Sequence, residues 1–135
     1  MSAVKLDDLI SQMENYLECW KQFNQYLAQA RAKKFEPEDE TQFLEIKSVL
    51  TQELELILAS VQVESPSKDD IVGLIAGAPS VRYMSELSDN ALRNLENQWH
   101  KIYIGWHSIL GQLKVRQHAD ENKSSLGSIF GKKDK

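Results

Sequence analysis

The stretch NQWHKIYIGWHSIL, residues 97–110, gathers the chain's most chemically versatile side chains. Its two histidines, His100 and His107, could ligate a metal ion, and its two tryptophans could surround a cofactor. The two histidines are seven residues apart, which in a helix separates them by about 10.5 Å along the axis. One zinc ion cannot bind both, because Zn–N bonds are about 2.0–2.1 Å long. We therefore expect no metal and no other cofactor at this stretch.

Other candidates for chemistry are equally incomplete. Glu96 lies four residues before His100, but this helix supplies no third ligand nearby, and the Glu-x-x-His motif of di-iron bundles is absent because Trp99 stands three residues after Glu96. The acidic cluster 38–40 lacks the spaced oxygens of a calcium loop. The only cysteine, Cys19, is more typical of helix packing than of catalysis. These patterns predict a protein that is not an enzyme.

Apolar residues repeat at intervals of three and four along most of the chain, as in helices with one buried face. This spacing predicts long helices over 6–33, 37–62 and 89–118, with a shorter broken element over 68–87. Pro37 suits a first helical turn, and Ser67 and Ser88 are suited to cap the helices that follow them. The segment GLIAGAPS follows no strand and lacks the lysine of a phosphate loop, so its glycines indicate close packing and a stop.

Short connections between long helices favour antiparallel neighbours. We therefore predict an all-α fold, an up-and-down antiparallel helical bundle of three long helices plus one short or broken helical element. The bundle domain covers residues 1–118. A flexible C-terminal tail, residues 119–135, follows it, because its Ser, Gly, Lys and Asp content cannot bury enough surface to order itself.

The heptad phase of the last helix predicts which of its residues are buried. With Leu92 at position a, both Trp99 and Trp106 fall in the core, and Trp20 is in phase to join them. The alternative is a ligand-binding or enzymatic bundle whose pocket is lined by Trp20, Trp99, Trp106 and Glu53. Glu53 lies about 60° from the centre of its helix's apolar face, at about 100° per residue, so it is either a partly exposed flank or half of a buried pair.

The same phase leaves an unusual outer face. Ile104 falls at position f, almost opposite the core, with His100, Tyr103 and His107 around it. Either the broken element around 71–83 folds over this face, or a partner docks there, since exposed apolar patches mark interaction sites. A smaller stripe on the second helix faces the third element or a partner, and it consists of Val49 and Leu56.

The tail carries one apolar island, formed by Leu126, Ile129 and Phe130 and followed by two lysines. It is either a frayed terminus or latch, or a short linear motif that anchors in a groove of a partner. The stretch SSLGSIFGKK, residues 124–133, resembles short terminal peptides that load cargo into protein shells.

The formal charge of −4 and the pI near 5.4 argue against nucleic acid as the partner. No apolar run approaches the ~20 residues of a membrane helix, so we expect no membrane insertion. The opening residues lack a signal peptide, and one cysteine allows no internal disulfide, which favours the cytoplasm. We predict a non-catalytic protein-interaction module, such as an adaptor, scaffold component or small chaperone. Its partner is another protein or a second copy of itself.

Overall fold

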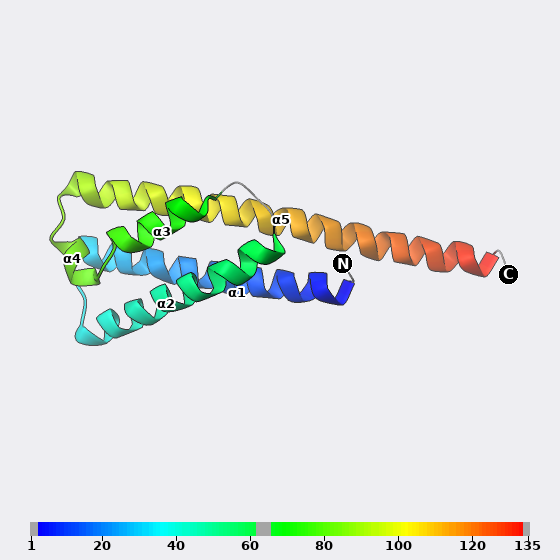
Figure 1. Cartoon of the computed structure of the whole chain (residues 1–135), viewed down its shortest axis with the longest axis horizontal. Helices are drawn as coiled ribbons and strands as arrows, with labels where there is room; N and C mark the ends of the chain where they lie inside the picture. The colour runs from blue at the N-terminus through cyan, green and yellow to red at the C-terminus, as the bar shows by residue number, and fades with distance from the viewer. Residues whose placement is uncertain (1–2, 62–65, 134–135) are drawn as a thin grey trace.

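The computed structural model describes residues 3–61 and 66–133, and the side chains of residues 6–61 and 66–121. Within these residues there are five helices and no strand. Figure 1 shows how the helices are arranged. The helices are α1 (Ala3–Ala32), α2 (Pro37–Ser60), α3 (Lys68–Gly77), α4 (Val81–Ser85) and α5 (Asp89–Lys133). The predicted all-α bundle is confirmed, with α3 and α4 as the broken element.

The central helix is α1, which contacts α2, α4 and α5, while α3 packs on α5 (Figure 1). Two ion pairs show that α1 and α5 are antiparallel. Near the end of α1, Arg31 Nη2 lies 2.6 Å from Glu96 Oε1. Near its start, Glu14 Oε2 lies 3.3 Å from Lys114 Nζ. Rising numbers on one helix therefore meet falling numbers on the other.

Short polar side chains set the helix starts. The Ser67 hydroxyl accepts a hydrogen bond from Asp70 N at 3.1 Å, and the Ser88 hydroxyl accepts one from Ala91 N at 3.1 Å. Both bonds satisfy amide groups that have no partner inside their own helix. The N-terminal caps predicted at these two serines are confirmed.

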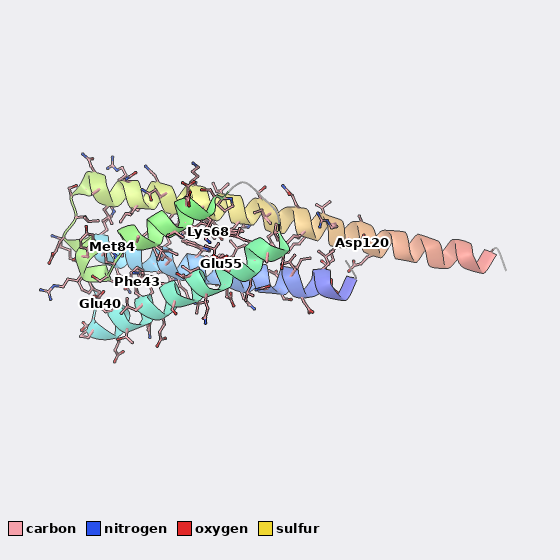
Figure 2. All side chains as sticks on the ribbon, in the orientation of Figure 1. Glu40, Phe43, Glu55, Lys68, Met84 and Asp120 are labelled. Carbon is pink, nitrogen blue, oxygen red and sulfur yellow. The ribbon has the colours of Figure 1, made fainter. Side chains whose placement is uncertain are left out.

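The acidic start of α2 has a structural role. The carboxylate of Glu40 accepts hydrogen bonds from the backbone amides of Val81, at 2.6 Å, and Arg82, at 3.3 Å. It therefore caps α4, whose first amides, like those of any α-helix, have no partner inside the helix. Farther along α2, the ammonium of Lys47 donates to the carbonyl oxygen of Pro79 at 3.1 Å. These contacts fix the turn between α3 and α4; Figure 2 labels Glu40 beside Met84 of α4.

The last helix continues past His118 to Lys133, so the helix end that we predicted near residue 118 is wrong. Gln117 Nε2 still bonds Asp7 Oδ1 of α1, which itself begins at Ala3. Figure 2 labels Asp120 near the point where α5 passes this end of α1, and beyond it α5 projects as a single helix (Figure 1). A single helix as short as this projecting part is only marginally stable in water. Its helical conformation therefore does not conflict with the predicted flexible tail.

Candidate functional site

The three tryptophans lie in the core. Trp20 and Trp106 are completely buried, and Trp99 is 9% exposed. The Tyr16 ring meets Trp106 edge-on at 5.6 Å and Trp20 at 6.2 Å between centroids. The indole N–H of Trp99 donates to the backbone oxygen of Trp20 at 2.7 Å. The predicted core placement of all three is confirmed, and these aromatic contacts stabilise the bundle interior.

Glu53 is half-buried beside the apolar face of α2. This agrees with the first of our two interpretations, a partly exposed position on the flank of that face. On the neighbouring surface of α1, burial raises the pKa of the half-buried Cys19 thiol, and the carboxylates of Glu53 and Glu18 raise that pKa further. A raised pKa leaves less of the nucleophilic thiolate at neutral pH. Tyr16, whose hydroxyl donates to the Leu50 backbone oxygen at 2.8 Å, fills the space beside the tryptophans. The geometry therefore favours packing over the alternative pocket.

The outer face of α5 is exposed. Ile104 is 52% exposed, so the interpretation in which residues 71–83 cover it is wrong. The physical reason is that Ile71 and Leu74 of α3 are themselves buried in the core. Pro66, which leads into α3, does cross α5 beside Gly105, where a Cβ would come within 2.9 Å of the proline ring. The chain thus passes one residue from Ile104 and leaves it uncovered.

Of the other residues predicted for this face, the two histidines are exposed, and Tyr103 lies beside α1. Tyr103 is half-buried and stacks on Trp99, with ring centroids 4.8 Å apart and planes 13° apart. His107 lies 5.9 Å from the Tyr103 ring and His100 lies 6.4 Å from the Trp99 ring, and both imidazoles are exposed. No group of three metal-ligating side chains occurs among the described residues. Tyr103 therefore links the outer face to the aromatic core.

Sequence reasoning missed how far this face extends. Val115 is 70% exposed, and it follows Ile104 by eleven residues, which is about 20° more than three full turns at about 100° per residue. The exposed residues that lie on the same line of the helix as these two are small. We name this surface the outer stripe of α5, formed by Ile104, Ser108, Gly111, Val115 and Ala119. The helical period alone could have found Val115, because it lies within the helix that we predicted over 89–118.

The tail residues Leu126, Ile129 and Phe130 lie where only the backbone is described, inside the projecting part of α5. Their side chains lie outside the described residues, so the linear motif stays a prediction.

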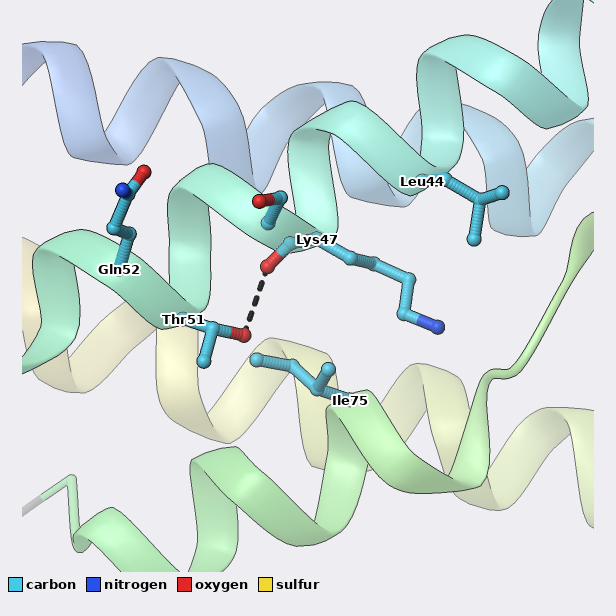
Figure 3. A pocket seen from close by; sticks show the side chains of 6 residues that line it. Leu44, Lys47, Thr51, Gln52 and Ile75 are labelled. Atoms are coloured by element: carbon cyan, nitrogen blue, oxygen red, sulfur yellow. Dashed lines mark hydrogen bonds between the residues drawn. The ribbon is translucent and has the colours of Figure 1, made fainter.

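A shallow groove of about 420 Å³ runs between α2 and α3 and is open to solvent (Figure 3). Its walls mix apolar and polar residues: Leu44, Lys47, Ser48, Thr51, Gln52 and Ile75. Thr51 does not point a free hydroxyl into it, because that hydroxyl donates to the Lys47 backbone oxygen at 2.8 Å. Outside the groove walls, Leu56 is 60% exposed and Val49 is half-buried, so Leu56 of the smaller stripe is uncovered.

Comparison with protein-family models, curated proteins and solved structures found no match. Within the described parts of the chain, no helix has the length and apolar character needed to cross a membrane.

Proposed function

We propose that this chain is a non-catalytic protein-interaction module that binds its partner through the outer stripe of α5. The observation that carries this proposal is the exposure of Ile104 and Val115 on a helix whose opposite face is packed into the core. An exposed apolar row on an otherwise amphipathic helix is the surface that helix-in-groove and helix-on-helix recognition use.

The residues suited to chemistry have structural roles instead, which supports a non-catalytic function. Trp20 and Trp106 fill the core, Glu40 caps α4, and the thiol of Cys19 has a raised pKa. Nucleophilic catalysis needs the opposite arrangement, a nucleophile with a lowered pKa or one beside a general base.

The class of partner follows from the surface chemistry. The chain carries a net charge of −4, which disfavours a polyanion such as nucleic acid. The outer stripe is short, apolar and interrupted by small residues, which suits another protein helix. We therefore propose an adaptor, scaffold component or small chaperone. A single free cysteine without a disulfide partner suits a reducing compartment, so we place the protein in the cytoplasm.

The test compares Ile104→Glu with Val72→Glu, a matched change at a 46% exposed residue of α3 that is not on the stripe. Both variants should keep the circular dichroism of wild type, because both positions are exposed. Proteins retained from native lysate are then quantified for each variant. We expect Ile104→Glu alone to lose partners that wild type and Val72→Glu both retain. Equal capture by all three chains would remove the stripe as the binding surface.

A further inference from the structure

The outer stripe continues into the projecting part of α5. Residues 104, 115 and 126 are spaced eleven apart, and each step of eleven adds only about 20° to three full turns. They are Ile104, Val115 and Leu126, so the register of one continuous helix carries the exposed face of the bundle into the tail. By backbone register, Leu126 of the apolar island therefore falls on the same face of α5 as Ile104 and Val115.

We infer that the occupant of this surface is a second copy of this chain, whose α5 packs antiparallel on the first with the two-fold axis at Val115. This inference rests on the proposed function and names its partner. In a two-fold contact, each residue meets the residue equally far on the other side of the axis. About Val115 the residue types correspond: Ile104 meets the equally large Leu126, Gly111 meets the small Ala119, Ser108 meets the polar Asn122, and Val115 meets itself.

The part of α5 that projects beyond the start of α1, residues 122–133, is its overhang. In this arrangement the overhang also gains a neighbour. Asp7 pairs with Gln117, so Ala3, the first described residue of α1, lies level with about residue 121. By register, each overhang then lies along the stretch of the partner's α5 that carries the partner's Ile104. Small residues flank the axis, and at Gly111 a Cβ would meet no atom within 4 Å in the single chain. Glycine and alanine there allow helix axes to approach to about 8 Å.

Charge favours the antiparallel orientation over a parallel one. In a parallel pair each residue meets its own copy, so Lys132 and Lys133 would meet the same lysines of the second chain. In the antiparallel register, positions 132 and 133 come opposite residues 98 and 97. Gln98 lines a groove together with the carboxylates of Asp69 and Asp70 and the ammonium of Lys101. The basic end of each tail therefore meets a region that carries more negative than positive charge.

The size of the contact sets the conditions under which it forms. The antiparallel register overlaps residues 97–133 of the two helices, about 55 Å at 1.5 Å per residue. With a helix about 10 Å wide, the buried area is roughly 550 Å² per copy. A standard interface buries about 800 Å² per partner, so this pair is a weak one. Self-association is expected at chain concentrations in the range of about 10 µM to 1 mM.

The orientation is tested by disulfide cross-linking in a Cys19→Ser background, with oxidised glutathione as the oxidant. A disulfide needs Cα atoms about 4.4–6.8 Å apart. Val115→Cys should therefore cross-link with itself, and a mixture of Ile104→Cys and Leu126→Cys should give a mixed dimer. Ile104→Cys alone should not, because two copies of residue 104 are about 33 Å apart along the axis. Val72→Cys on α3 is the exposed control that should stay monomeric.

Sedimentation measures the oligomeric state without cross-linking, over chain concentrations of about 10 µM to 1 mM. Wild type and Val72→Asp should shift from monomer to dimer, and Val115→Asp should remain monomeric. Self-linked Ile104→Cys would overturn the antiparallel orientation. A chain that is monomeric at every concentration and forms no cross-link would overturn self-pairing altogether. In that case, loss of partner capture by Ile104→Glu would still support the proposed function, so the two failures are distinguishable.

Discussion

Two tryptophans of the core differ in one atom's environment, and this difference predicts opposite responses to the same substitution. The indole N–H of Trp99 donates to the Trp20 backbone oxygen at 2.7 Å. The indole N–H of Trp106 is buried and has no hydrogen-bond partner among the described residues. We predict that Trp99→Phe destabilises the bundle more than Trp106→Phe does, although Trp106 is the more deeply buried of the two.

The magnitude follows from two contributions. Phe is smaller than Trp by roughly 40 Å³, and residual cavity costs about 24 cal/mol per Å³, so the lost volume costs about 1 kcal/mol at either site. Trp99→Phe also removes a hydrogen bond worth about 0.5–1.5 kcal/mol, for a total loss of about 1.5–2.5 kcal/mol. Trp106→Phe removes a donor whose burial without a partner costs about 1–3 kcal/mol, which offsets or exceeds the cavity. The cavity cost is the same at both sites and cancels, so the two variants should differ by roughly 1.5–4.5 kcal/mol.

Urea denaturation followed by far-ultraviolet circular dichroism measures this difference without relying on tryptophan fluorescence. Trp99→Ala and Trp106→Ala are the controls, and each should lose about 3–5 kcal/mol, because alanine leaves a large cavity at either site. His107→Ala, at the exposed neighbour of Trp106, should change stability by no more than about 0.5 kcal/mol. A larger loss for Trp106→Phe than for Trp99→Phe would refute the reasoning from the unpaired indole.

The remaining predictions concern one buried hydroxyl, one strained residue and the overhang. Tyr16→Phe should lower the free energy of unfolding by about 0.5–1.5 kcal/mol by urea denaturation, because it removes the hydrogen bond to Leu50. Burial raises the pKa of Tyr16, so the neutral hydroxyl contributes to the free energy of unfolding below pH ~10, and this contribution is lost as the pH rises further. Tyr16→Phe should therefore make the alkaline fall in stability less steep. Lys33, which directly follows α1, has a φ of 58° in the left-handed region, and Lys33→Gly should raise the free energy of unfolding by up to about 1 kcal/mol in the same assay. Deleting residues 121–135 should leave the thermal midpoint nearly unchanged at low chain concentration, and a drop of several degrees would show that the overhang packs on its own bundle.

The heptad phase is why the core of α5 could be predicted from sequence. A residue's angular position depends only on its own helix, so Trp99 and Trp106 could be assigned to the buried face without knowing what covers them. The caps at Ser67 and Ser88 were predictable for the same reason, because each bonds an amide three residues away.

Contacts between helices could not be predicted in this way. Arg31 donates to both Asp89 and Glu96, and Glu40 caps α4 from the start of α2. Such contacts depend on the axial register between helices that are distant in sequence, and no local pattern encodes that register. Tyr103 shows the same difficulty in part, since it stacks on Trp99 of its own helix but also lies beside Leu17 and Lys21 of α1.

The misplaced end of α5 had the largest consequence for function. Ending the helix at His118 made Ile104 and the tail island two unrelated features, one on a helix and one in a flexible segment. A composition rich in Ser and Gly predicts a helix end only when the segment must support itself. A helix that gains a partner along one face can tolerate residues with poor helix propensity, because packing outweighs propensity. The weak composition of residues 119–133 and the eleven-residue spacing of Ile104, Val115 and Leu126 are therefore compatible, and both agree with the pairing of α5 that we propose.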